Sequence, residues 1–320
     1  MKVYKLSFWP ALLWHIYHCF DLQVLPFPRK PIRVLSLFDG LASGLVVLSN
    51  NLRLKLSAYF SSEIDGDAIT VQRRRHCGKI IGLGDVRKLT SEVLDSLGDI
   101  SLLIGGSPCD NLSLVNPLRA GLADESASGS LFFNFVVIRD YLMDKAMRNR
   151  RPFYWLFENT AKLEVSTQEA MTAALGCSPV MCCSSSYLPA RRQRLFWGNT
   201  PYINEVAEEM RRRVRTTSMQ DIIGPDRLPS LEIFPTITTN GSAKVCVQTG
   251  KITAVYANGR ADTLEISDYE RLLGFTQSYT DVGRLSFSRR LRLLGKSWCI
   301  DVVTELLRPL VDLFECDISN

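Results

Sequence analysis

Short apolar runs alternate with amphipathic stretches along the chain from residue 31 onward. Runs rich in β-branched and aromatic residues predict strands at residues 32–37, 54–61, 79–82, 100–104, 153–157 and 195–197. Between these strands, apolar residues have helical spacing and predict helices. The first of these helices ends near residue 48, and the others span residues 65–75, 90–97 and 130–147. This regular alternation predicts an α/β fold with a doubly wound, mostly parallel sheet that helices cover on both faces.

The pattern changes after residue 200. Residues 201–262 are polar and irregular, with arginines clustered at 211–215 and scattered prolines, so we expect a smaller inserted lobe there. Helical spacing returns at 266–273 and again at 289–310. The predicted organisation is a lead-in segment (1–30), a core (31–200), an inserted lobe (201–262) and C-terminal helices that return to the core (263–320).

The lead-in segment contains an apolar stretch, residues 6–20, that follows two lysines. Pro10, His15 and His18 interrupt this stretch, it is too short to span a bilayer, and no small-residue cleavage site follows it. We therefore expect a segment that packs on the domain, or the remnant of a longer protein, rather than a signal peptide or a membrane anchor.

The composition limits the class of protein and the side chains that can take part in catalysis. The 320 residues are 46% hydrophobic and 22% charged, which is typical of a globular protein. Lys and Arg outnumber Asp and Glu by 38 to 33, a mildly basic balance that permits a nucleic-acid partner without requiring one. Nine cysteines without CxxC spacing, beside only three histidines, argue against a zinc module or a disulfide framework. We expect no metal, and a reaction that uses Cys, Glu, Asp or Arg.

Glycines and acidic residues follow the first three predicted strands. Residues 38–44 read FDGLASG, and glycines at a strand-to-helix turn let the backbone approach a ligand. Glu63 ends the second strand, where carboxylates bind ribose hydroxyls, and Asp85 follows the third, where an adenine amino group could be read. Each feature is common by itself, but three in register predict a nucleoside-bearing cofactor. The spacing departs from GxGxxG, which favours an adenosyl cofactor over a dinucleotide.

Further reactive groups fall at the same edge. Cys109 ends the sequence GGSPC after the fourth strand; a lone cysteine is usually a small buried hydrophobe, but in a Gly-Pro loop it is also a candidate nucleophile. Glu158 ends the fifth strand. It is either an ordinary solvated carboxylate at a strand end or, because apolar residues precede it, a carboxyl group that can act as an acid. Arg192 and Arg194 share one face by alternation, either solvated or converging on a phosphate or carbonyl. Together these groups suit thiolate addition to an electron-poor ring, followed by methyl transfer.

Nearly all of the chain after residue 30 closely resembles the catalytic domain of animal de novo DNA cytosine-5 methyltransferases, and the resemblance is weakest at 202–262. The motifs that carry it are, in order, RVLSLFDG, GGSPC, NPxRxGL, LFFxF, WLFEN, FWGN, TITT and LLGKSW. The resemblance implies a Rossmann-like methyltransferase sheet with a target-recognition lobe, and S-adenosylmethionine as the methyl donor. The residues that it places around the donor are Phe38, Asp39, Gly40, Ser43, Glu63, Asp85, Val86, Ser297 and Trp298, with Lys296 beside them.

The same resemblance implies the roles of the reactive groups. Cys109 would add to C6 of a cytosine that is flipped out of duplex DNA, and Glu158 would protonate or hydrogen-bond N3. Arg192 and Arg194 would steady the cytosine carbonyl and a nearby phosphate. Thr238, Thr239 and Asn240 would contact DNA; Asn240 stands where the best-known family member has an arginine that reads guanine, so the resemblance leaves CpG versus non-CpG preference open.

Two self-association surfaces are also implied. Residues 131–135 retain the aromatic patch, with Phe132, Phe133 and Phe135, through which family members pair with each other or with a regulatory relative. A core helix face would account for some of these rings but not all of them. The second, charged surface keeps Asp281 but has Phe287 in place of the family's arginine, so we expect it to be altered or lost.

Two other functions compete with this interpretation. A catalytically silent subunit that stimulates an active methyltransferase would have eroded motifs, whereas here the reactive residues persist. A cytosine-5 enzyme acting on RNA is the second, although the motifs NPLRAGL and LLGKSW favour the DNA group. A DNA-binding module without catalysis is poorly supported by the modest net charge of +5. Nuclear localisation is expected from the substrate.

Overall fold

The computed structural model describes residues 29–108, 130–237, 246–247, 250–251 and 255–317. The chain divides into two compact units, residues 1–30 and 31–320. Cys109 and the segment 238–240 lie outside the described residues, as do nearly all residues of the first unit. The fold that follows is that of the second unit.

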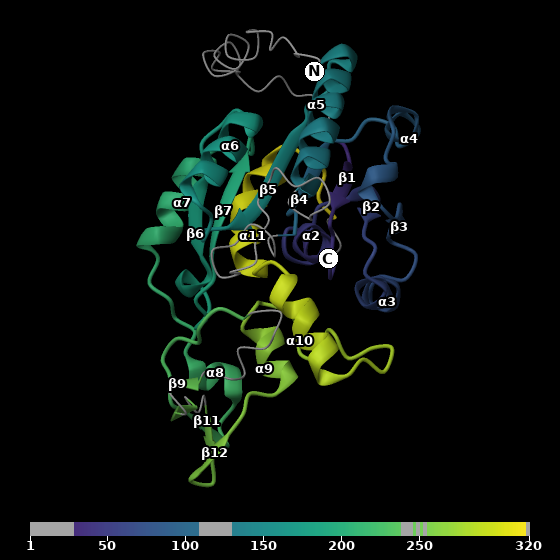
Figure 1. Ribbon diagram of the computed structural model, residues 1–320. Helices are drawn as coiled ribbons and strands as arrows, with labels where there is room; N and C mark the ends of the chain where they lie inside the picture. The colour runs from purple at the N-terminus through teal and green to yellow at the C-terminus, as the bar shows by residue number, and fades with distance from the viewer. Residues whose placement is uncertain (1–28, 109–129, 238–245, 248–249, 252–254, 318–320) are drawn as a thin grey trace. The chain divides into compact units, whose positions relative to one another are not determined.

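A seven-stranded sheet forms the centre of the second unit, in the order β3-β2-β1-β4-β5-β7-β6 (Figure 1). Its strands are β1 (Ile32–Leu37), β2 (Leu56–Ser62), β3 (Ile81–Gly82), β4 (Leu102–Gly105), β5 (Tyr154–Thr160), β6 (Val180–Cys183) and β7 (Gln193–Gly198). The first five strands are parallel, and β7 runs antiparallel to both of its neighbours. The predicted doubly wound, mostly parallel sheet is thus confirmed.

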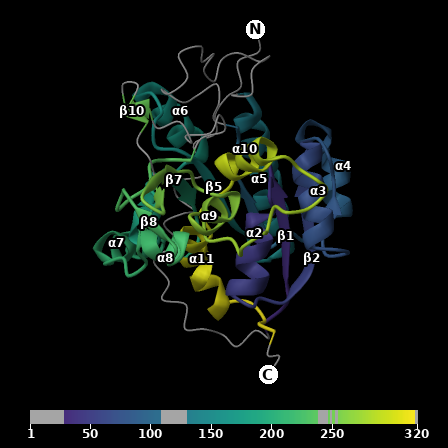
Figure 2. The ribbon, with the colours of Figure 1, turned by 90° about the horizontal axis from the view of Figure 1, so that it is seen from below.

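Helices cover both faces of the sheet (Figures 1 and 2). One face carries α2 (Ser43–Leu45) with its π-helical continuation Val46–Asn51, α3 (Gly66–Arg75), α7 (Ile203–Arg212) and α11 (Ile300–Leu307). The other carries α4 (Ser91–Ser96), α5 (Leu131–Asn149) and α6 (Val165–Leu175). Neighbours in β1 divide between the two cores, Val34 on the first and Leu35 on the second, which explains why the strand sequences are apolar throughout.

The smaller lobe follows α7. It contains α8 (Met219–Ile223), β8 (Arg227–Pro229), the hairpin β9 (Cys246–Val247) and β10 (Gly250–Lys251), then β11 (Val255–Ala257), β12 (Arg260–Asp262) and α9 (Ile266–Arg271). Strands β12, β11 and β8 form an antiparallel sheet. The buried carboxylate of Asp268 accepts two hydrogen bonds from Arg227, at 2.8 and 2.9 Å, which joins α9 to β8. The lobe shares its apolar core with the first face of the large sheet, since Ile223 and Val255 belong to the same cluster.

The secondary structure differs from the predictions in several places, and α8 and β8 to β12 are short elements in a region expected to be irregular. Residues 203–212, expected to be irregular, form α7, because Ile203, Val206, Ala207 and Met210 have helical spacing and pack towards β6 and α11. The sequence patterns did not predict α6 and β6. The single helical run expected at 289–310 is two helices, α10 (Phe287–Lys296) and α11, because Ser297 takes an extended conformation between them. The domain boundaries themselves remain predictions.

Candidate active site

The loop after β1 is held in an uncommon backbone conformation. Phe38, Gly40 and Ala42 all have positive φ, of 56°, 54° and 58°. For residues with a Cβ atom this left-handed conformation costs about 1 kcal/mol or more, so the surrounding contacts must stabilise it. One such contact is the amide of Gly40, which donates to Glu63 Oε2 at 2.7 Å. The carboxylate at the end of β2 therefore anchors the loop at the end of β1.

Asp39 lies buried beneath this loop. Its carboxylate accepts hydrogen bonds from Ser36 Oγ at 2.6 Å, from the Tyr59 hydroxyl at 2.7 Å and from Gln72 Nε2 at 3.2 Å. Burial raises the pKa of Asp39 to about 6, although the hydrogen bonds from Ser36 and Tyr59 oppose this shift. Sequence reasoning missed Tyr59 and Gln72; the available signal was polar groups on a strand and a helix that otherwise face the core.

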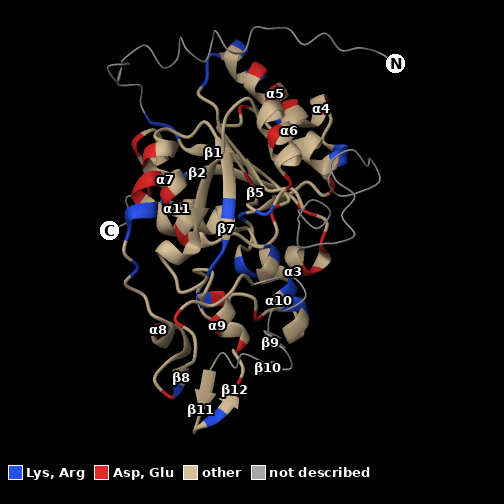
Figure 3. Cartoon of the chain, turned by 60° about the vertical axis from the view of Figure 1, so that its left-hand side comes forward, with Lys and Arg blue, Asp and Glu red and all other residues tan. Residues whose placement is uncertain are grey.

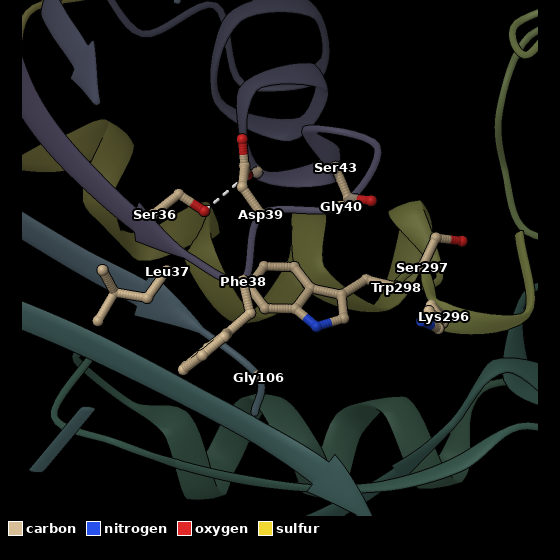
Figure 4. A pocket seen from close by; sticks show the side chains of 11 residues that line it. Ser36, Leu37, Phe38, Asp39, Gly40, Ser43, Gly106, Lys296, Ser297 and Trp298 are labelled. Atoms are coloured by element: carbon tan, nitrogen blue, oxygen red, sulfur yellow. Dashed lines mark hydrogen bonds between the residues drawn. The ribbon is translucent and has the colours of Figure 1, made fainter. Parts of the chain in front are cut away.

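A pocket opens above the loop, with an empty volume of about 330 Å³ that includes its solvent-open part (Figure 4). Six of the predicted cofactor residues line it: Phe38, Asp39, Gly40, Ser43, Ser297 and Trp298. The other lining residues are Ser36, Leu37, Gly44, Gly106 and Lys296. The pocket therefore combines the ends of β1 and β4 with the segment between α10 and α11. An aromatic wall beside a tight turn at the start of a helix fits a ligand with a flat ring and polar substituents.

The remaining predicted cofactor residues lie outside the lining of this pocket. Glu63 supports the loop through Gly40, and its other oxygen accepts from the amides of Ile64 and Asp65, both at 2.8 Å. Asp85 accepts from the amide and the guanidinium of Arg87 and begins the short helix that follows. Val86 is buried in the second core.

Glu158 lies at the end of β5, beside the pocket. Its Oε1 forms an ion pair with Arg194 Nε at 2.7 Å, and its Oε2 accepts from Trp298 Nε1 at 3.2 Å. The side chains of Glu158 and Arg194 are only 12% and 14% exposed. The carboxylate is therefore neither a freely solvated strand end nor isolated in an apolar setting. It is held on both oxygens.

Arg192 differs from its prediction as a substrate-contacting residue. Its side chain is buried, and its two terminal nitrogens donate to the carbonyls of Ile237 at 3.2 Å, Gly295 at 3.0 Å and Ser297 at 2.5 Å. The two arginines therefore do not converge on one ligand: Arg194 holds Glu158, whereas Arg192 holds backbone. A guanidinium with several donors in one plane suits such a cluster of carbonyls.

The predicted nucleophile, Cys109, lies outside the described residues, but the residues before it are tied to the same edge. Ser107 is buried next to the end of β4, and Asn159 Nδ2 donates to its carbonyl and to its hydroxyl, both at 3.4 Å. The residue after Glu158 thus fastens the segment that leads to Cys109. The predicted DNA contacts Thr238, Thr239 and Asn240 also lie outside the described residues.

The aromatic interface prediction needs correction for two residues. Phe132 and Phe135 are fully buried and contact Phe157, with ring centroids 5.3 and 4.7 Å apart, so they form core rather than an interaction surface. Phe133 is 45% exposed and is the ring that remains available. Asp281 is exposed and pairs with Arg290 at 3.3 Å.

Among the described residues, no group of three His, Cys, Asp or Glu side chains is arranged to hold a metal ion. Within the same ranges, no helix is long and apolar enough to cross a membrane.

Comparison with known proteins relates part of this chain to one family. Residues 32–175 match the family described as C-5 cytosine-specific DNA methylase. DNA (cytosine-5)-methyltransferase DRM2 of Arabidopsis thaliana is 35% identical over 129 residues, covering 37% of this chain and 20% of the relative. The orphan methyltransferase M.Rho11sI of Bacillus phage rho11s is 31% identical over 133 residues, covering 41% of this chain and 24% of the relative. The chain thus spans about a quarter or less of these curated relatives.

Solved structures resemble the whole fold. Entamoeba histolytica methyltransferase EhMeth has a TM-score of 0.66 at 13% identity and covers 90% of this chain and all of its own. S. pombe Dnmt2 methyltransferase has a TM-score of 0.59 at 15% identity, covering 87% of this chain and 99% of its own. At such identities the likeness concerns the fold alone. The sequence matches point to one family: residues 32–175, a little under half of the chain, match the C-5 cytosine-specific DNA methylases, and the similar curated relatives are cytosine-5 DNA methyltransferases or phage methyltransferases.

Proposed function

We propose that the protein transfers a methyl group from S-adenosylmethionine to C5 of a cytosine flipped out of duplex DNA, as the animal de novo enzymes do. The observation that carries this proposal is the geometry of Glu158. Its carboxylate lies beside the pocket, is held by Arg194, and adjoins Asn159, which fastens the segment leading to Cys109. An acid, a pocket and the approach to a nucleophile therefore share one sheet edge.

The pocket residues fit the donor. Phe38 and Trp298 offer apolar walls, Ser43 lies where a helix begins, and Glu63, outside the lining, keeps one lone pair on Oε2 at the end of β2. Lys296 adds a cation that suits a carboxylate group of the ligand. When bound, S-adenosylmethionine supplies an electrophilic methyl group. Asp85 and Val86, which also belong to this proposal, lie after β3 at the same sheet edge.

The chain's own residues would prepare the base. The Cys109 sulfur adds to C6, and Glu158 places a proton at N3, so that negative charge does not accumulate on the ring and C5 becomes nucleophilic. Arg194 keeps the Glu158 carboxylate oriented and can reach the cytosine carbonyl. After methylation, a base takes the C5 proton, the Cys109 thiolate leaves C6, and N3 returns its proton to Glu158, which restores the neutral aromatic ring.

Access to a flipped base requires DNA at the carboxyl edge of the sheet. Basic residues occur on β7 and on α10 (Figure 3). The segment before Thr238 is fastened near this edge, because Thr236 Oγ1 donates to the carbonyl of Arg191 at 2.7 Å. We expect Thr238, Thr239 and Asn240 to contact DNA; an amide at position 240 cannot reproduce the bidentate arginine–guanine contact, so bisulfite sequencing of the product would decide between CpG and non-CpG preference.

Methyl transfer from labelled S-adenosylmethionine to unmethylated duplex DNA tests the proposal. Incorporation at cytosine C5 is expected for the wild-type chain, no incorporation for Cys109→Ser, and a large loss for Glu158→Gln. Duplex RNA and transfer RNA serve as competing acceptors, and preferential methylation of either would replace DNA as the substrate. A folded wild-type chain that binds a related methyltransferase but transfers no methyl group would instead be a regulatory subunit.

The remaining proposals follow from this activity. The substrate implies a nuclear location. Association with itself or with a related methyltransferase subunit would use the exposed Phe133 and, in altered form, the surface around Asp281 and Phe287. The core, target-recognition lobe and C-terminal helices would act as one catalytic unit.

A further inference from the structure

Trp298 connects the pocket to the acid. The chain leaves α10 at Ser297, whose extended backbone (φ −76°, ψ 164°) turns the next residue into the pocket. From there the indole Nε1 donates to Glu158 Oε2 at 3.2 Å, a contact between residues 140 positions apart in the chain. Figure 4 shows this indole lying across the pocket between Phe38 and Ser297. One side chain thus serves both as pocket wall and as hydrogen-bond donor to Glu158.

The orientation of Glu158 depends on this donor. Arg194 pairs with Oε1, and because rotation about the last side-chain bond moves both oxygens, one ion pair does not by itself fix the plane of the carboxylate. Gly106 closes the other side: a Cβ atom at that position would lie 2.7 Å from Glu158 Oε2 and 3.4 Å from Trp298 Nε1. The Trp298 hydrogen bond is therefore the contact that fixes the second oxygen.

The backbone that carries Trp298 is itself held from the sheet. Arg192 donates to the carbonyls of Gly295 and Ser297, immediately before the tryptophan. The position of the indole is thus set by a buried guanidinium on one side and by whatever fills the pocket on the other.

We propose that Trp298 is a positioning residue that makes the orientation of the Glu158 carboxylate depend on an occupied cofactor pocket. The inference rests on the proposed function. A ligand ring against the indole restricts its rotation, and the Nε1–Oε2 hydrogen bond passes that restriction to the acid. An empty pocket leaves the acid less well aligned, so the base is activated only when a methyl donor is present.

Trp298→Phe keeps an aromatic wall and removes the donor. We expect the Kd for S-adenosylhomocysteine, measured calorimetrically, to change by less than about threefold. The single-turnover rate of methyl transfer at saturating cofactor should fall about tenfold or more, which is the usual effect of losing one hydrogen bond to a charged group. Trp197→Phe is the matched control. The Trp197 indole Nε1 donates to Thr172 Oγ1 at 3.1 Å, and neither residue lines the pocket. Equal rates for wild type and Trp298→Phe would overturn the proposal.

A second measurement does not depend on activity. Only five tryptophans are present, so the ¹⁵N-¹H indole resonance of Trp298 can be assigned from its loss in Trp298→Phe. It should shift on addition of S-adenosylhomocysteine and again in Glu158→Gln, whereas the Trp197 resonance should not. A Trp298 resonance insensitive to either change would refute the coupling. Absence of wild-type transfer to DNA would refute the proposed function instead, and the resonance would still decide the coupling.

Discussion

A methyl group added at Gly106 would enter the space between Glu158 and the Trp298 indole. The new Cβ atom of Gly106→Ala would lie 2.7 Å from Glu158 Oε2 and 3.1 Å from the Glu158 carbonyl oxygen. The carbonyl belongs to the sheet and cannot retreat, so the carboxylate has to move. Restoring an ordinary carbon–oxygen contact of about 3.4 Å requires a displacement of roughly 0.7 Å. That displacement would lengthen the hydrogen bond from Trp298 or the ion pair with Arg194.

The expected result is a loss of rate with a modest loss of stability. A misplacement of about 1 Å in a catalytic group costs about 100-fold in rate, so Gly106→Ala should lose about 10- to 100-fold. Overpacking of this kind lowers the free energy of unfolding by about 1–3 kcal/mol. Single-turnover methyl transfer and urea unfolding measure the two effects separately.

Gly66→Ala is the matched control, because a Cβ atom there meets nothing within 4 Å and the residue begins α3. This control should keep the wild-type rate and gain up to about 1 kcal/mol of stability. A wild-type rate for Gly106→Ala would show that Glu158 does not need the orientation described above.

Four further substitutions test other parts of the structure. Arg192→Met should lower the free energy of unfolding by about 3 kcal/mol or more in urea titrations, because three buried carbonyls lose their donor; an unchanged unfolding midpoint would contradict this role. Asp39 binds its proton more tightly in the folded protein (pKa about 6) than in the unfolded chain (3.8), so its contribution to stability should fall by about 3 kcal/mol as pH rises from about 4 to about 6. Unfolding curves of Asp39→Asn across that range should lack this component, and parallel curves for the two proteins would refute it. Phe132→Ala should cost about 3–5 kcal/mol, whereas Phe133→Ala should cost less than about 1 kcal/mol and weaken self-association in sedimentation; similar losses of stability for both would be inconsistent with their burial.

Part of the site could be predicted because a local rule generates it. Parallel strands bring their carboxyl ends to one edge, so residues that follow them, such as Asp39, Glu63 and Glu158, must gather there whatever the packing details. Apolar runs and motif order were therefore enough to predict the sheet. This local rule does not reach the segment around Trp298, which only the family resemblance placed at the pocket.

Helix faces show where local patterns become insufficient. The family resemblance implied a surface patch of three rings in residues 131–135, but helical geometry turns Phe132 and Phe135 onto the sheet and leaves Phe133 outside. Helix α7 was missed because a run of arginines at its end outweighed the spacing of Ile203 and Met210. In both helices the apolar residues have helical spacing, and which of them are buried depends on the side of the helix that faces the core.

The sequence by itself determined the α/β class, the edge at which the reactive groups gather, and the similarity of residues 32–175 to the C-5 cytosine-specific DNA methylases. Tertiary structure alone decided which group each reactive residue contacts. Arg192 and Arg194 are two positions apart with the same side chain, yet one holds backbone carbonyls and the other holds Glu158. The reason is physical: each contact joins segments distant in the chain, and their relative placement depends on how the whole core packs, which no local pattern encodes.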